Sequence, residues 1–199
     1  MAGAPQGPVF VEADPADPAF APPSPRQVPD ALLDASADSI EIEGSRVDFR
    51  PLCSENVGDL KRLNSVLFPI NYNDKIYEQC MQSGRCTQLA YVGNELVGAI
   101  ACRLEARAGG AACYIATLGV HAPYRGQCLG TVLLHRAMQA CRDDDAIGEA
   151  LLHVQTNNDA ALKFYLRNNF RVLGVVKNYY RRIAPPDAWL LRLRLRERG

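Results

Sequence analysis

One stretch decides the fold: Pro123-Tyr124-Arg125-Gly126-Gln127-Cys128-Leu129-Gly130-Thr131. Before it, residues 113–120 are mostly β-branched, aromatic or apolar, which is typical of a buried strand. After it, residues 131–141 carry apolar side chains at helical spacing. Glycines let a backbone approach a ligand, and the first N–H groups of a helix attract anions. The stretch therefore indicates a pyrophosphate site, although a strand, a glycine turn and a helix also form the ordinary connection of α/β proteins.

The length and the composition predict one folded domain with a tail. The 199 residues suit a single domain, and the apolar content is sufficient for a core. Eight of the thirteen prolines lie in the first thirty residues, where apolar residues follow no regular period. Such a segment buries too little apolar surface to offset the entropy of ordering. We expect a disordered acidic tail over residues 1–38 and a folded domain over residues 39–199.

Positive charge collects in the expected domain. Residues 1–45 hold eight acidic side chains and one basic side chain, while the whole chain has 22 of each, so residues 46–199 carry a net charge of +7. This charge suits an anionic partner such as a nucleotide cofactor, an RNA surface or an acidic protein face, and it does not choose among them. The sequence has no run of eighteen or more apolar residues, and its start is acidic and proline-rich, so we expect no membrane span and no signal peptide. We expect a location in the cytoplasm, with the nucleus as a second compartment.

The seven cysteines are scattered and include no C-x-x-C pair. Several fall inside apolar runs, where cysteine acts as a small hydrophobic residue. We therefore expect reduced thiols, no disulfide framework and no metal site.

Periodicity and turn signals predict a mixed α/β domain with the element order β-α-α-β-β-β-α-β-α-β-β. We expect helices over residues 54–67, 74–82, 131–141 and 160–167. We expect a strand or a hairpin over residues 40–52, interrupted at Gly44-Ser45. We expect further strands over residues 87–92, 95–105, 112–120, 151–154, 170–176 and 189–195.

Two titratable residues lie on strands that lead into helices. Tyr114 lies in the strand before the quoted loop, and His153 lies near the end of the strand before the last helix. Ligands of open α/β sheets bind at such strand ends, so we expect these two ends to lie close together. Each residue alone is more often a core side chain than a catalytic one.

Several motifs carry a resemblance to a known family. Arg125-x-x-Cys128-x-Gly130 resembles the acetyl-CoA signature R/Q-x-x-G-x-G/A of the GCN-five-related N-acetyltransferases (GNAT superfamily). Asn158-x-x-Ala161-x-x-x-Tyr165-x-x-x-x-Phe170 resembles their second motif. A closer resemblance, to the catalytic subunits of N-terminal acetyltransferase E (NatE), covers about residues 46–195. It is carried by residues 60–64, 68–75, 114–119, 152–155 and 177–183.

The resemblance implies a fold and an activity. The fold is a single GNAT domain with a mostly antiparallel seven-stranded sheet, a splayed parallel pair of strands at the cofactor site and about four flanking helices. The activity is transfer of acetyl from acetyl-CoA to the free α-amino group of protein N-termini, with a preference for a retained Met followed by a larger residue. Nascent or mature N-termini are then the substrates, and a large auxiliary subunit and the ribosome are further partners. Membrane, DNA and metal are not expected.

The resemblance also implies direct attack of the amine on the thioester. A free N-terminal amine has a pKa of about 7.7 to 8.0 and is mostly protonated at neutral pH, so a base is needed. Tyr114 and His153 match the family's base positions, where an ordered water can relay the proton. A free tyrosine with a pKa of about 10 is a poor base at pH 7, so His153 is the expected proton acceptor and Tyr114 the residue that positions the water. The developing oxyanion is expected to meet a backbone N–H around Leu118 to Val120.

Further residues match the cofactor positions of the family. Tyr165 would donate a proton to the departing thiolate, although Asn158 and Tyr165 also fit an ordinary helix cap and a core aromatic residue. Cys128 departs from the signature, which has glycine there. If that position needs a positive φ, cysteine costs about 1 kcal/mol or more. The expected cofactor-binding residues are Leu118, Val120, Arg125, Gly126, Gln127, Cys128, Gly130, Thr131, Asn158 and Tyr165.

Two apolar segments match the family's walls around the first side chain of the substrate. Proline ends the helix at residue 69 and makes a rigid aromatic bend, and apolar walls suit an apolar first residue such as Met. The expected substrate-binding residues are Phe68, Pro69, Ile70 and Tyr72 on one side, with Tyr179, Tyr180 and Ile183 on the other.

Two other classes of function stay open at this point. One is a non-catalytic or weakly active adaptor that docks to an N-terminal acetyltransferase complex or to the ribosome. The other is an RNA-binding module using the arginine-rich C-terminus, which the sequence favours less, because an edge strand is sufficient to explain the alternating Leu-Arg pattern.

Overall fold

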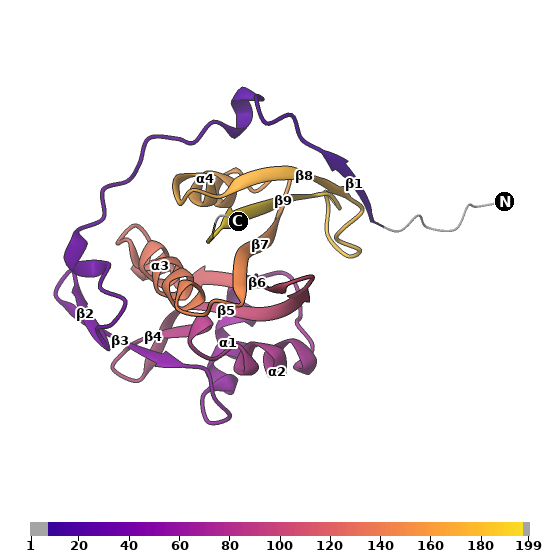
Figure 1. The fold of residues 1–199 in the computed structure, drawn as a ribbon. Coiled ribbons are helices and arrows are strands. Elements are labelled where there is room, and N and C mark those ends of the chain that lie inside the picture. The colour runs from indigo at the N-terminus through magenta and orange to yellow at the C-terminus, as the bar shows by residue number, and fades with distance from the viewer. Residues whose placement is uncertain (1–7, 197–199) are drawn as a thin grey trace. The chain divides into compact units, whose positions relative to one another are not determined.

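The computed structural model describes residues 8–196, and in that range it contains four α-helices and nine β-strands (Figure 1). Residues 1–7, the start of the expected tail, lie outside the described residues. The chain divides into two compact units, one of residues 1–26 with 151–194 and one of residues 27–150 with 195–199. No helix within residues 8–196 is long and apolar enough to span a bilayer.

Five antiparallel strands form the sheet of the larger unit, in the order β6-β5-β4-β3-β2. The expected break at Gly44 is a tight turn in which Glu43 and Gly44 both have positive φ, so the hairpin is the alternative observed over residues 40–52. The predicted hairpin at Gly93 is confirmed, and it joins β4 to β5. The strands are β2 (Ser39–Ile42), β3 (Ser45–Pro51), β4 (Gln88–Val92), β5 (Glu95–Arg107) and β6 (Gly110–Val120).

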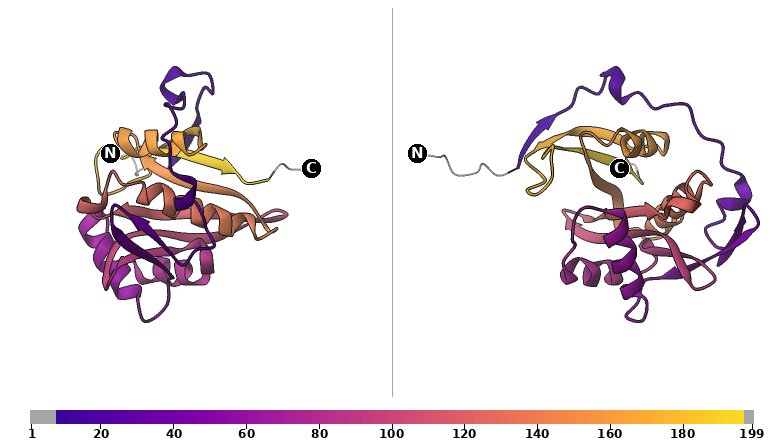
Figure 2. Two further views of the ribbon diagram at one scale, coloured as in Figure 1. Left: turned by 90° about the vertical axis from the view of Figure 1, so that its left-hand side faces the viewer. Right: turned by 180° about the vertical axis from the view of Figure 1, so that it is seen from behind.

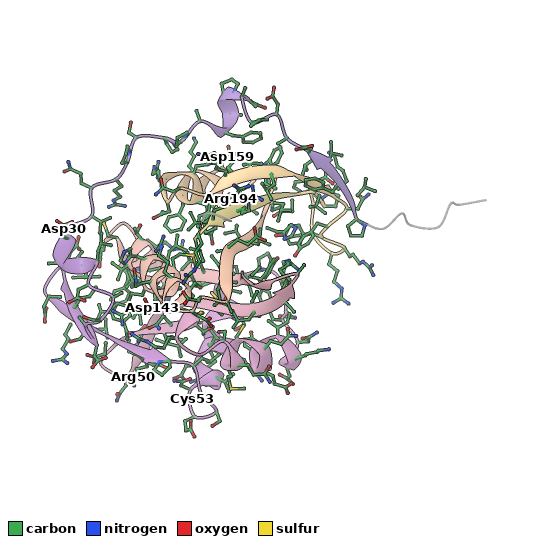
Figure 3. The ribbon with its side chains drawn as sticks, in the orientation of Figure 1. Asp30, Arg50, Cys53, Asp143, Asp159 and Arg194 are labelled. Carbon is green, nitrogen blue, oxygen red and sulfur yellow. The ribbon has the colours of Figure 1, made fainter. Side chains whose placement is uncertain are left out.

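Three helices cover this sheet, two on one face and one on the other (Figures 1 and 2). α1 (Val57–Leu67) and α2 (Asp74–Gln82) have apolar side chains three or four residues apart, which face the sheet. Their buried residues Leu60 and Tyr77 pack in one cluster with Leu89 and Tyr91 of β4. α3 (Leu129–Arg142) covers the opposite face, where a Cβ at Gly98 of β5 would lie 3.2 Å from Leu133 Cδ1. Asp143 follows the C-terminal end of α3 (Figure 3).

The smaller unit has the strand order β1-β8-β9-β7, in which β8 (Arg171–Lys177) is antiparallel to both β1 (Val9–Glu12) and β9 (Ala188–Arg194). β7 (Ile147–Gln155) runs from the larger unit into this one. α4 (Asp159–Arg167) starts at the exposed Asp159 (Figure 3). It ends as expected at an asparagine pair, where Asn169 has a φ of 66°.

The expected tail contains structure within its described residues. β1 pairs with β8, and the ring of Phe20 packs edge-on against Trp189 with 5.1 Å between centroids. In the larger unit, the buried Arg136 donates to the backbone carbonyls of Asp34 at 3.2 Å and Ala37 at 2.7 Å. Nothing in a proline-rich sequence without a regular period signals these long-range contacts. The division of the chain at residue 38 stays a prediction.

Candidate active site

The loop between β6 and α3, where the sequence predicts an anion site, contains two residues with positive φ. Gly126 has a φ of 82°, and Cys128, the N-cap of α3, has a φ of 65° and a ψ of −2°. The first backbone hydrogen bond of the helix runs from Val132 N to Cys128 O at 3.0 Å. The N–H groups of Leu129, Gly130 and Thr131 precede that bond, so they have no acceptor within the helix. They lie at the positive end of a 14-residue helix.

Two side chains of this loop hydrogen-bond to backbone carbonyls and hold its conformation. Arg125 Nε donates to the Val120 carbonyl at 2.9 Å, and Gln127 Nε2 donates to the Pro123 carbonyl at 3.2 Å. The side chain of Arg125 thus ties the loop to the end of β6. This contact was not predicted, because the signature only suggested a cofactor role for that residue.

The end of β6 presents backbone donors on its side away from β5. His121 N–H donates to Val97 O of β5 at 2.7 Å. N–H groups alternate in direction along a strand, so the N–H groups of Leu118 and Val120 point away from β5. A β-bulge lies just before them, where Thr117 pairs with Ala101 but Ile115 pairs with Cys102. Such bulges redirect a strand end and often lie next to active sites.

The aromatic bend after α1 lies against the same strand end. A Cβ at Gly119 would lie 2.5 Å from Leu67 Cδ1 and 3.2 Å from Phe68 Cζ, so only glycine fits there without displacement of its neighbours. The ring of Phe68 meets that of Tyr72 edge to face, with 6.2 Å between centroids. Pro69 is exposed and Ile70 is half-buried in the same bend. The structure therefore brings the predicted wall next to the predicted oxyanion donors, and Gly119 is the residue that sequence reasoning missed.

Tyr114 lies earlier on β6, where it pairs with Arg103 of β5. The Arg103 guanidinium carbon lies 4.3 Å from the centre of the Tyr114 ring, and Arg103 is held in turn by Glu105 at 2.8 Å. Tyr114 is half-buried. Arg103 thus holds the ring of Tyr114, which was proposed from the sequence as a catalytic group. No local sequence signal indicated this contact.

In the smaller unit, the proposed base meets one of the proposed walls. The imidazole of His153 on β7 stacks on the ring of Tyr179, with 4.0 Å between centroids and 10° between planes. Tyr179 meets Tyr180 edge to face at 4.8 Å. The three half-buried rings form one contiguous aromatic series.

Asp187 and Gln155 fasten the loop that carries these tyrosines. Asp187 accepts from Lys177 Nζ at 2.7 Å and from the backbone N–H of Asn178 at 2.9 Å. Gln155 Nε2 donates to the Pro185 carbonyl at 2.8 Å. The Lys177 ammonium and the Asn178 N–H hold the pKa of Asp187 below its ordinary value. Ile183 lies half-buried in this loop, and sequence reasoning missed Asp187 as the residue that holds the loop to Lys177 and Asn178.

Comparison with known proteins identifies the family of this chain. Residues 57–170 match the model of the acetyltransferase (GNAT) family. N-alpha-acetyltransferase 50 of Danio rerio is 39% identical over 151 residues, which cover 76% of this chain and 90% of the relative. The probable N-acetyltransferase san of Drosophila melanogaster is 37% identical over 152 residues, which cover 76% of this chain and 83% of the relative. The chain belongs to the GNAT family.

A solved GNAT structure shares the fold. Arabidopsis thaliana Naa50, in complex with the bisubstrate analogue CoA-Ac-MVNAL, superposes with a TM-score of 0.70 at 43% identity, covering 74% of this chain and 97% of that one. The predicted GNAT fold class is confirmed, with nine strands in residues 8–196 instead of seven. The difference consists of β1 and the hairpin of β2 and β3 over residues 40–52.

The second GNAT motif has ordinary structural roles in this chain. The exposed Asn158 caps α4, and its Oδ1 accepts from Ala161 N–H at 3.1 Å. Tyr165 is buried, and its ring packs edge-on against Phe170 with 5.3 Å between centroids. Asn158 thus caps the start of α4 and Tyr165 packs on its core side, and their cofactor roles stay predictions.

The predicted GNAT site residues divide between the two units. The larger unit brings together the cofactor loop, the end of β6 and the wall of Phe68 to Tyr72. The smaller unit brings together His153, Tyr179 and Tyr180.

Proposed function

We propose that this chain is an acetyl-CoA-dependent N-alpha-acetyltransferase that modifies the free α-amino group of protein N-termini. The stack of His153 on Tyr179 carries the proposal, because it joins a titratable group to the aromatic wall expected at the substrate. The relatives named N-alpha-acetyltransferase, and the Arabidopsis relative solved with a CoA–peptide analogue, support it.

The loop from β6 to α3 fits the diphosphate of coenzyme A. Gly126 is exposed and, as a glycine, has no side chain to block a ligand. The first N–H groups of α3 supply donors at the positive end of the helix. Acetyl-CoA supplies the activated acetyl thioester. Arg125 holds the loop by its bond to Val120 O, so the donors are already in position before a ligand binds.

The chain's own residues then move two protons, one from the amine and one to the thiolate, and stabilise one developing charge. His153 accepts the proton of the attacking amine through water, and Tyr114 orients that water. The N–H groups of Leu118 and Val120, directed away from β5, donate to the carbonyl oxygen as it becomes negative. Tyr165 returns a proton to the departing thiolate.

The substrate preference follows from the walls. Phe68, Ile70 and Tyr72, with Tyr179, Tyr180 and Ile183, are aromatic or aliphatic and suit an unbranched apolar first side chain. We propose a retained Met, followed by a residue that prevents Met removal. The analogue bound by the Arabidopsis relative carries the peptide MVNAL, which supports Met at the first position.

A peptide panel that varies the first two residues tests the activity. Wild-type protein is expected to acetylate Met-starting peptides fastest, and His153→Ala and Tyr114→Phe are each expected to lower kcat by about 10²-fold or more. His121→Ala, a half-buried histidine at the end of β6, is the matched control and should keep full activity. Full activity in both His153→Ala and Tyr114→Phe would refute the assignment of the base.

Thermal unfolding with acetyl-CoA separates this proposal from the adaptor alternative. A ligand at a hundred times its Kd adds about 2.7 kcal/mol to the free energy of unfolding. The enzyme is expected to show that stabilisation, whereas an adaptor with a defective loop at Cys128 would show none.

We further propose that the chain acts in the cytoplasm during translation, with the nucleus as a second location, and that it docks to a large auxiliary subunit and to the ribosome. The net charge of +7 over residues 46–199 supports contact with an anionic surface. Ribosome co-sedimentation should fall as salt rises, and salt-independent absence of binding would contradict the docking proposal.

A further inference from the structure

Three cysteines far apart in the sequence bring their sulfurs together in the larger unit. Cys86 ends the short helix η3 (Gly84–Cys86), Cys113 lies on β6 and Cys141 lies near the end of α3. Their Sγ atoms all lie within 4.8 Å of one another, and those of Cys86 and Cys141 are 3.4 Å apart. The three residues are 5%, 0% and 0% exposed.

The spacing suits coordination of a single ion. Sulfurs bonded at about 2.3 Å to one centre lie about 3.4 to 3.8 Å apart around a pyramidal ion with a lone pair, and about 4.0 Å apart around a trigonal planar ion. The observed spacings, from 3.4 Å up to a limit of 4.8 Å, bracket both values. Small side-chain rotations are therefore enough to place all three sulfurs around one ion. Thiolate ligands select soft ions.

Because the three sulfurs are buried, the site favours an ion whose charge makes the complex neutral. A net charge in an apolar core is costly unless a partner compensates it. Among the described residues Arg136 is the buried charged side chain, and it already binds the carbonyls of Asp34 and Ala37 and lies 4.1 Å from the centre of the Phe49 ring. Three thiolates with a monovalent ion leave a charge of −2, and with a divalent ion a charge of −1. A trivalent ion gives a neutral complex.

We propose that Cys86, Cys113 and Cys141 form a three-coordinate site for a trivalent thiophilic ion of the arsenite class. Arsenous acid and three thiols react without electron transfer. Three As–O bonds and three S–H bonds break, three As–S bonds form, and three water molecules leave. The product links η3, β6 and α3 across the core, so bound ion stabilises the larger unit.

The test uses the full chain, reduced with a phosphine and titrated with sodium arsenite. The half-buried thiols of Cys53 and Cys128 are first removed by Cys53→Ala and Cys128→Gly. We expect one arsenic per chain in the intact mass, with the loss of three hydrogens, and a higher unfolding temperature. A second sample is refolded in arsenite, so that slow entry into the closed core does not hide the site.

Single variants assign the ligands. Cys86→Ala, Cys113→Ala and Cys141→Ala are each expected to weaken arsenite binding at least tenfold. Cys80→Ala is the matched control, because Cys80 is equally buried at 1% exposure but lies outside the cluster, and it should bind arsenite as the parent does. A parallel titration with Cd²⁺ is expected to show weaker binding, since that complex leaves a buried charge.

Three results would overturn the proposal. They are no bound arsenic after refolding, arsenic binding that survives all three cluster substitutions, and tighter binding of Cd²⁺ than of arsenite. None of these readouts depends on acetyltransferase activity.

Discussion

Cys128 holds a left-handed backbone at the start of α3, with a φ of 65°. An L-residue in that conformation costs about 1 kcal/mol or more, because its Cβ crowds the backbone, and glycine removes the clash. The chain therefore tolerates strain in the loop proposed to bind the cofactor, and the N–H of the residue is present with either side chain.

Cys128→Gly is expected to raise the free energy of unfolding by about 1 kcal/mol, reduced somewhat by the greater freedom of glycine in the unfolded chain. Urea unfolding measures the change. Cys128→Ala keeps a Cβ and should differ from wild type by only a few tenths of a kcal/mol. Equal stability of the Gly and Ala variants would show that the backbone is not strained there.

Gly119 is the contact between the Phe68 bend and the end of β6. Gly119→Ala places a Cβ 2.5 Å from Leu67 Cδ1 and 3.2 Å from Phe68 Cζ. We expect a loss of about 1 to 3 kcal/mol of stability from overpacking, with slower acetylation as the wall moves. Chemical unfolding and peptide kinetics measure the two effects. Gly148→Ala is the control, because a Cβ at that strand glycine meets nothing within 4 Å, and it should be neutral in both assays.

At the scale of elements, Asp187 links the loop of Tyr179 and Tyr180 to the end of β8. Its contacts to Lys177 and Asn178 lower its pKa from the ordinary 3.8. The folded pKa lies below the unfolded one, so the link stabilises the folded loop above the unfolded pKa. This contribution is lost as the pH falls through the folded pKa.

We therefore expect the loop to loosen only in acid, below pH 3.8. The amide chemical shift of Asn178, followed from neutral pH downward, should titrate in wild type and not in Asp187→Asn.

The Asp187→Asn variant should also raise KM for the peptide more than KM for acetyl-CoA. Asp48→Asn removes a comparable surface pair, with Arg46 at 2.9 Å, and should leave both observables unchanged. An unaltered titration in Asp187→Asn would assign the shift to another group.

At the scale of the whole molecule, residues of the N-terminal segment complete the edge of a sheet. β1 covers the edge of β8, and Gly174 allows the close approach, since a Cβ there would lie 2.3 Å from Val11 O. Without β1, the outer N–H and C=O groups of β8 lose their partners, and open edges promote association between chains.

Deletion of residues 1–26 is expected to increase self-association at high protein concentration, measured by sedimentation velocity. Deletion of residues 1–7 keeps β1 and should behave as the full chain does. Equal sedimentation of both truncated proteins would show that β1 does not protect this edge.

The sequence by itself determined the local elements and the family. α2 has the predicted bounds, Asn169 ends α4 in the left-handed conformation, and the Gly93 hairpin joins β4 and β5. These features depend on periodicity and turn chemistry within a few residues, which the sequence displays directly. The loop at Cys128 belongs to the same class, because one short segment contains its strand end, turn and helix start.

Only the tertiary structure decided the contacts between distant segments. The stack of His153 on Tyr179, the fit of Gly119 against Phe68, and the meeting of Cys86, Cys113 and Cys141 join residues that no local pattern relates. Each contact depends on how strands align and how helices pack on them, and those alignments come from burial of the whole core. The sequence thus specified which chemical groups the chain carries, and the packing of the core selected which of them meet.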